Sequence, residues 1–222
     1  VNERPSAVIA GTHGKTSTSS FLFQLFHHVG YAPSFCIGGR VPPFDVPAGV
    51  GSDQGPFVVE GDESDGTLAL YAPTFAIVTN VDFDHMEHFE SPAAFEQCFS
   101  TFMSRVHHRL LYCADDPRTA SLARPFPSAL GYGFSENADY RAQDAAWTPH
   151  ALEYTLIRRG QPLGRIETSL PGRHNVLNTL ASIALALEWG VPFARLQEAA
   201  RQLSLPRRRF ERVPTRPEIL VL

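Results

Sequence analysis

Residues 7–16, close to the start of the chain, constrain the fold more than any other stretch. They read Ala-Val-Ile-Ala-Gly-Thr-His-Gly-Lys-Thr, which is typical of a short buried strand, a glycine-flanked loop and a helix that opens at Gly14. Two glycines let backbone N–H groups approach an anion, and a helix N-terminus carries partial positive charge. Lys15 adds a mobile charge, and the Thr16 hydroxyl can ligate Mg²⁺. The stretch predicts a phosphate-binding loop. An ordinary strand-to-helix turn is the alternative, because a full Walker A motif would need glycine at Ile9.

Apolar strands and helices alternate along much of the chain. Helical periodicity lies between most of the apolar runs with strand character, which are 7–10, 35–37, 57–59, 75–80, 110–112 and 129–134. This alternation is typical of an α/β fold of the P-loop type, with a mostly parallel sheet flanked by helices. Two runs of alternating apolar residues, 152–156 and 166–170, flank a turn and predict a small antiparallel accessory sheet. Two helices follow after residue 175.

Charged side chains follow two of the buried strands at their carboxyl ends. Four carboxylates lie within residues 60–65, and a cluster that includes His85 follows the strand at 75–80. In an open α/β sheet the ligand lies at the carboxyl ends of the strands, where Lys15 would also emerge. At least one carboxylate is therefore expected to hold a divalent cation. A solvated acidic loop and a structural histidine are the alternatives.

The composition fits an ordinary globular domain and gives no sign of a nucleic-acid or membrane partner. The 222 residues carry a formal net charge of −4, and no run of basic residues marks a polyanion groove. Three cysteines without a CxxC pair favour a reduced, cytoplasmic setting. No apolar run reaches the roughly 18 residues that span a bilayer, and no signal peptide is recognised. Residues 219–222 look like an interrupted strand, so we expect residues 1–222 to be one domain of a longer protein.

These motifs together resemble the central, ATP-binding domain of the Mur ligases. The resemblance covers nearly the whole chain and is carried by five motifs in the family's order, which are 11–16, 60–65, 79–80 with 84–86, 172–175 with Asn178, and 209–210. In such enzymes ATP phosphorylates a substrate carboxylate, and the amino group of an amino acid attacks the acyl phosphate. The resemblance implies that the chain uses ATP and Mg²⁺ in forming an amide, ADP and phosphate.

The resemblance also implies which residues bind the nucleotide. Lys15 matches the lysine that contacts the β- and γ-phosphates, and Asn175 matches an adenine-contacting asparagine. Arg209 matches an arginine near the phosphates, although the arginines at 207–209 could also be merely solvated. The nucleotide-binding loop consists of Gly11, Thr12, His13, Gly14, Lys15 and Thr16.

Two metal positions follow from the same resemblance. Thr16 and Glu60 match the ligands of a first Mg²⁺, and His85 matches a ligand of a second Mg²⁺ between the γ-phosphate and the substrate carboxylate. Cations at this place make physical sense, because two anions must be brought together. The resemblance thus implies catalytic roles for Lys15, His85 and Arg209.

Within the family, His13 and the run 63–66 favour the member that joins L-alanine to UDP-N-acetylmuramate over the recycling member that attaches a tripeptide. A domain that grips the UDP moiety is expected before Val1, and one that binds the amino acid after Leu222. The isolated chain should then be a monomer with little or no catalytic activity, and Lys15 should be exposed in its empty site. A stand-alone nucleotide-binding module and a small-molecule kinase are the competing hypotheses.

Overall fold

The strand that leads into the predicted phosphate loop lies in the middle of the sheet. The computed structural model describes residues 1–83 and 88–207. Within these residues the strands form one sheet in the order β10-β9-β8-β7-β6-β5-β1-β4-β2-β3. Strand β1 pairs in parallel with β4 on one side and β5 on the other. The prediction of a mostly parallel sheet flanked by helices is confirmed.

The elements follow one another in a regular α/β sequence over the first part of the chain and turn antiparallel later. The strands are β1 (Ser6–Ala10), β2 (Ser34–Val41), β3 (Val46–Gly49), β4 (Phe57–Glu60), β5 (Phe75–Val78), β6 (Arg109–Cys113), β7 (Leu130–Gly133), β8 (Tyr140–Trp147), β9 (Leu152–Arg158) and β10 (Gln161–Thr168). The helices are α1 (Lys15–His28), the 3₁₀ helix η1 (Thr67–Leu70), α2 (Pro92–Ser104), α3 (Pro117–Ala123), α4 (Arg173–Glu188) and α5 (Phe193–Ala200).

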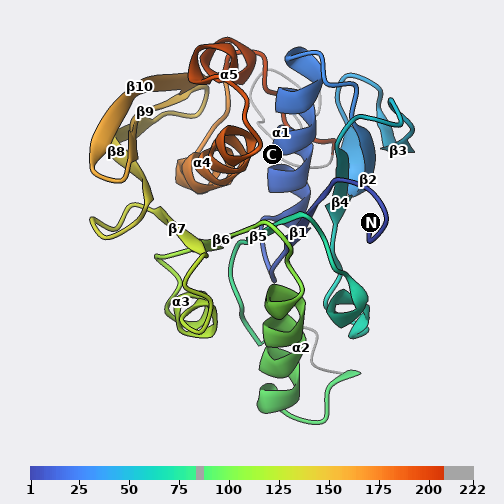
Figure 1. Ribbon diagram of the computed structural model, residues 1–222. Helices are drawn as coiled ribbons and strands as arrows, with labels where there is room; N and C mark the ends of the chain where they lie inside the picture. The colour runs from blue at the N-terminus through green and yellow to red at the C-terminus, as the bar shows by residue number, and fades with distance from the viewer. Residues whose placement is uncertain (84–87, 208–222) are drawn as a thin grey trace, which may run out of the picture.

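Helices cover both faces of the sheet. Helices α1, α4 and α5 pack on one face, and α2 and α3 lie on the other (Figure 1). The two faces of β1 show why its sequence reads as continuously apolar: Ala7 and Ile9 belong to the core under α1, whereas Val8 and Ala10 belong to the core under α2. A strand buried on both faces needs apolar residues at every position. Among the described residues, no helix is long and apolar enough to cross a membrane.

The antiparallel strands extend the main sheet and do not form a sheet of their own. Strands β9 and β10 pair as the predicted hairpin, but β8 joins them to β7, which it meets in parallel. At the other edge β3 pairs antiparallel with β2. Side-chain packing on the sheet decides which strands pair, and the apolar pattern of a single strand cannot report it.

Parallel pairing brings the loops after β1, β4 and β5 to a single edge of the sheet. Ile9 lies opposite Glu60, and Ala10 lies opposite Val78. After β1 the chain forms β2, β3 and β4 on one side of that strand within the sheet, and it then continues at β5 on the other side of β1. A crevice at such a reversal is where open α/β sheets bind ligands.

The end of α4 is attached to the sheet by a charged cluster around Glu188. Arg109 and Arg158 donate to its two carboxylate oxygens at 3.0 and 2.7 Å, and the Tyr140 hydroxyl donates at 2.6 Å. Burial alone would raise the pKa of Glu188. The hydrogen bonds from Tyr140 and Arg158 and the charges of the two arginines outweigh burial and hold this pKa below its usual range.

Replacing Glu188 with alanine should lower the free energy of unfolding by about 1–3 kcal/mol, because Tyr140 and two partly solvated arginines lose a common hydrogen-bond acceptor. Urea denaturation at pH 7 measures the change. Since the pKa of Glu188 is lowered in the folded state, its contribution should fade as the pH falls through the folded-state pKa. The matched control is Glu136→Ala, whose side chain is 92% exposed and 3.9 Å from Arg141. An equal loss in both variants would contradict this account of the cluster.

Candidate functional site

The phosphate loop, residues 11–16, is built on two glycines with positive φ. Gly11 has φ of 128°, and a Cβ atom there would lie 2.1 Å from the Thr79 Oγ1 atom. Gly14 has φ of 85° and stands directly before the first residue of α1. Both positions require glycine, the first because of the close approach and the second because of its left-handed backbone. The loop can therefore turn from β1 into α1 within four residues.

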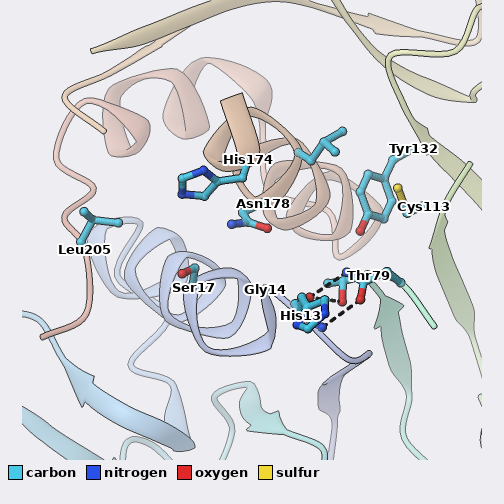
Figure 2. Close-up of a pocket in the computed structure, with 11 residues that line it drawn as sticks. His13, Gly14, Ser17, Thr79, Cys113, Tyr132, His174, Asn178 and Leu205 are labelled. Carbon is cyan, nitrogen blue, oxygen red and sulfur yellow. Dashed lines mark hydrogen bonds between the residues drawn. The ribbon is translucent and has the colours of Figure 1, made fainter. Parts of the chain in front are cut away.

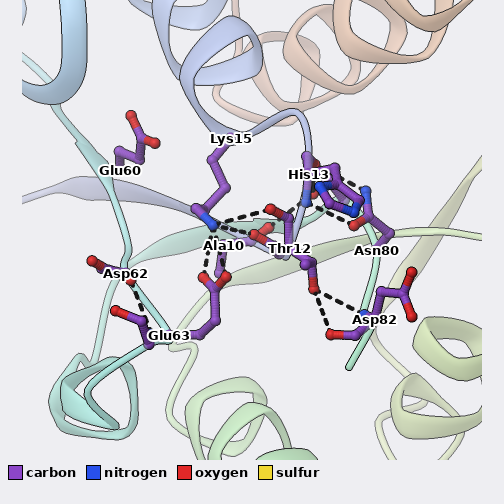
Figure 3. A network of polar contacts seen from close by, with 12 residues as sticks. Ala10, Thr12, His13, Lys15, Glu60, Asp62, Glu63, Asn80 and Asp82 are labelled. Atoms are coloured by element: carbon purple, nitrogen blue, oxygen red, sulfur yellow. Dashed lines mark hydrogen bonds and ion pairs between the residues drawn. The ribbon is translucent and has the colours of Figure 1, made fainter. Parts of the chain in front are cut away.

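The loop is held from one side by residues 79–82, which follow β5 (Figure 3). The Asn80 side chain accepts a hydrogen bond from the His13 N–H at 2.8 Å and donates to the His13 carbonyl at 2.9 Å. The Thr79 hydroxyl donates to the same carbonyl at 2.7 Å. Thr12 donates its N–H to the Asn80 carbonyl, and its hydroxyl exchanges hydrogen bonds with the backbone of Asp82. These bonds use the polar backbone groups of Thr12 and His13.

The backbone N–H groups that come next are free. Within the described residues, the amides of Gly14, Lys15, Thr16 and Ser17 have no hydrogen-bond partner. Four such amides at the N-terminus of a 14-residue helix form a site for an anion. The geometry of the loop is therefore suited to binding the phosphates of a nucleotide.

Glu60 and Thr16 lie side by side at this edge of the sheet. The Thr16 hydroxyl donates to Glu60 Oε1 at 2.9 Å, and the Gly38 N–H donates to Oε2 at 2.6 Å. A carboxylate and a hydroxyl beside a phosphate site suit Mg²⁺, which prefers oxygen ligands and usually combines few protein ligands with phosphate and water. The described residues contain no group of three or more His, Cys, Asp or Glu side chains placed to hold a metal.

The four carboxylates of the acidic run divide into two kinds. Asp62 and Asp65 are exposed and accept hydrogen bonds from backbone N–H groups two residues ahead, as such side chains do in turns. Glu60 faces Thr16, and Glu63 is buried. Asp62 and Asp65 therefore fit the solvated loop that the sequence offered as one alternative, and the metal-binding role of Glu60 stays a prediction.

Lys15 is held inside the site, which corrects the expectation that it would be exposed. Its side chain is 15% exposed, and its ammonium group lies 2.8 Å from both carboxylate oxygens of Glu63. It also donates to the Gly11 carbonyl at 2.6 Å. The prediction of an exposed lysine failed because the buried partner lies 48 residues away in the sequence.

Two cavities flank the loop. The carboxylate cavity, of about 570 Å³, is lined by Lys15, Glu60, Asp62 and Glu63 among others. The α1–α4 cavity, of about 320 Å³, lies between the starts of these two helices and is lined by His13, Gly14, Ser17, Tyr132, His174 and Asn178 among others (Figure 2). A ligand that spans the phosphate loop could reach into both.

Asn175 does not line the α1–α4 cavity but supports a residue that does. It is fully buried, donates to the Pro171 carbonyl at 2.8 Å, and accepts a hydrogen bond from Asn178 at 3.1 Å. His174, Leu177 and Asn178 are the residues of α4 that line the cavity, and Figure 2 shows His174 and Asn178 there. Partial burial lowers the pKa of His174. The sequence pattern predicted no separate role for His174, although this residue stands in the motif 172–175 at the start of α4. Two further predicted residues, His85 and Arg209, lie outside the described residues.

The sequence matches a known family over most of its length. The pattern of the Mur ligase middle domain matches residues 9–186. A UDP-N-acetylmuramate–L-alanine ligase from Anaeromyxobacter sp. (strain Fw109-5) is 42% identical over 206 residues, covering 91% of this chain and 44% of that protein. One from Syntrophobacter fumaroxidans is 35% identical and covers 98% of this chain and 47% of that protein. The chain thus spans about half the length of these relatives.

Solved structures share the fold. The UDP-N-acetylmuramate–alanine ligase of Thermotoga maritima superposes with a TM-score of 0.85 at 26% identity, over 97% of this chain and 49% of that one. A Neisseria ligase, named for joining UDP-N-acetylmuramate to L-alanyl-γ-D-glutamyl-meso-diaminopimelate, has a TM-score of 0.81 at 27% identity, over 92% of this chain and 68% of that one.

Replacing Lys15 with methionine should destabilise the empty protein by about 3 kcal/mol, because the buried Glu63 carboxylate loses its partner. The double variant Lys15→Met with Glu63→Met should recover part of this loss, since no buried charge is left unpaired. Chemical denaturation of the three proteins tests the contact. A Lys15→Met variant as stable as the parent would show that Lys15 and Glu63 are not paired.

Proposed function

Because the chain belongs to the Mur ligase family, we propose that it is the ATP-binding middle domain of a UDP-N-acetylmuramate–L-alanine ligase. The observation that carries the proposal is the row of free amides at 14–17 next to the Thr16–Glu60 pair. That arrangement supports a magnesium-bound triphosphate at the start of α1. The reaction would belong to peptidoglycan precursor synthesis in the cytoplasm.

The described residues support a division of tasks around the loop. The amides of Gly14 to Ser17 and the Lys15 ammonium would bind phosphates, and Thr16 and Glu60 would hold Mg²⁺. ATP would supply the phosphoryl group that activates the substrate carboxylate. We keep His85 as the proposed ligand of a second Mg²⁺ and Arg209 as a proposed phosphate contact from the sequence alone.

The α1–α4 cavity is the proposed adenine site. It opens beside Gly14 at the phosphate loop, and Asn178 presents an amide to it from α4. His13 and His174 would flank the base. Asn175 would act there through its hydrogen bond to Asn178 at 3.1 Å, which modifies the direct contact expected from the sequence.

The carboxylate cavity is the proposed place of the UDP-N-acetylmuramate carboxylate. It opens on the other side of Lys15 and contains Glu60. A substrate carboxylate placed there would meet the γ-phosphate across the metal position. The chemistry therefore depends on fixed cations and amides that lower the repulsion between the two anions.

The choice of L-alanine over a tripeptide is supported by the names of the relatives. Proteins 35–42% identical to this chain are named UDP-N-acetylmuramate–L-alanine ligases. The solved tripeptide-adding ligase from Neisseria and the alanine ligase from Thermotoga are similar to this chain at 27% and 26% identity, so the support comes from the named relatives alone. The amino acid would be bound by a domain that this chain does not include, so we propose a three-domain enzyme with residues 1–222 in the middle.

The test is a ligation assay on the intact protein that contains this chain. With UDP-N-acetylmuramate, ATP and Mg²⁺, we expect product with L-alanine and none with the tripeptide. The isolated 222-residue monomer should bind ATP weakly and form no product. Product with the tripeptide alone would reassign the protein to the recycling reaction. Tight ATP binding without any ligation by the intact protein would favour a nucleotide-binding module.

Replacing Glu60 with glutamine should raise the Mg²⁺ concentration for half-maximal activity at least tenfold, because the metal loses an anionic ligand. The pH profile should change little, since Glu60 is proposed to bind metal and not to transfer a proton. The matched control is Glu198→Gln, at an exposed position on α5. Loss of one limb of the pH profile with an unchanged Mg²⁺ requirement would contradict the metal role.

A further inference from the structure

Glu63 is a buried acid that the proposed reaction does not use. It is 1% exposed, whereas its neighbour Asp62 is exposed. Both of its carboxylate oxygens lie 2.8 Å from the Lys15 ammonium nitrogen (Figure 3). A carboxylate in such a place is costly unless a charged partner satisfies it. Its function should therefore be sought in what it does to Lys15.

The contacts of Lys15 fix its ammonium group at the mouth of the phosphate loop. Glu63 and the Gly11 carbonyl provide the close acceptors, and the Thr12 carbonyl lies farther away at 3.3 Å. A lysine side chain is otherwise flexible and loses rotamer freedom when it is ordered. Because Thr12 is the weakest acceptor, its bond is the one that a phosphate oxygen can replace without breaking the contact to Glu63.

The contact between Lys15 and Glu63 also cancels the positive charge of the lysine, which a phosphate would otherwise meet. The carboxylate cavity is lined by one lysine and by three carboxylates, Glu60, Asp62 and Glu63. A triphosphate without metal brings further negative charge into this surrounding. We infer that Glu63 is a positioning residue, which holds Lys15 in place and neutralises it, so that phosphate binding requires a divalent cation. The inference rests on the proposed function in taking the loop as a triphosphate site.

The sequence offers a direct probe of this contact, because Lys15 is the only lysine in the chain. Protein labelled with ¹⁵N- and ¹³C-lysine gives one set of lysine side-chain NMR signals. We would titrate the 222-residue chain with inorganic tripolyphosphate, once with Mg²⁺ and once with EDTA. In the wild-type protein, added tripolyphosphate should shift the Lys15 signal when Mg²⁺ is present. The apparent affinity of the protein for tripolyphosphate, taken from this shift, should be at least tenfold weaker in EDTA.

The variant Glu63→Gln removes the charge and keeps the size of the side chain. It should bind tripolyphosphate in EDTA at least tenfold more tightly than the wild type does. The difference between its tripolyphosphate affinities in Mg²⁺ and in EDTA should therefore be smaller than in the wild type. Asp62→Asn is the matched control, because it removes an equal charge from the same cavity without touching Lys15. Because Asp62 is exposed and solvent screens its charge, that control should gain much less affinity in EDTA than Glu63→Gln does. Glu63→Met replaces Glu63→Gln if the latter does not fold, and the wild-type titrations need no variant.

Three results would overturn the inference. In the first, tripolyphosphate shifts the wild-type Lys15 signal equally in Mg²⁺ and in EDTA. In the second, tripolyphosphate binding by Glu63→Gln depends on Mg²⁺ as much as binding by the wild type does. In the third, Asp62→Asn gains as much affinity in EDTA as Glu63→Gln does. A loop that binds no tripolyphosphate under any condition overturns it as well.

A parallel titration with ATP separates the two proposals. If ATP binds no more tightly than tripolyphosphate while Glu63→Gln shows the expected gain, the role of Glu63 stands and the adenine site falls.

Discussion

The close contact between the phosphate loop and residues 79–82 is the constraint on which the site depends. Gly11 packs against Thr79 so tightly that a Cβ atom would overlap its hydroxyl. Asn80 binds both backbone groups of His13 in the manner of a neighbouring strand. Because these contacts use the amides of Thr12 and His13, the free amides begin at Gly14, where α1 starts. The direction of the helix and the place of the anion site are thus set together.

The charged side chains Lys15, Glu60 and Glu63 already have partners within the protein before any ligand arrives. Lys15 meets Glu63, and Thr16 donates to Glu60. A buried ion pair contributes little net stability, but the loss of either partner is costly. The site residues therefore take part in the stability of the fold, and a substitution among them affects both stability and binding. Variants of this site should be judged by ligand dependence as well as by activity.

The sequence predicted the features that depend on local pattern, and it missed those that depend on distant pairing. The phosphate loop and the α/β alternation are visible because glycine spacing and apolar periodicity are local. The pair Lys15–Glu63 joins residues 48 positions apart in the sequence, which no local pattern connects. Asn175 and Asn178 are one helical turn apart, so the sequence could not tell which of them faces the cavity.

A crystal structure of the chain soaked with Mg²⁺ and a non-hydrolysable ATP analogue tests the central claim most directly. The account predicts phosphate oxygens on the amides of Gly14 to Ser17, Mg²⁺ on Thr16 and Glu60, and the adenine beside Asn178 between α1 and α4. A nucleotide bound at any other place, with the amides at the start of α1 still free, would contradict it.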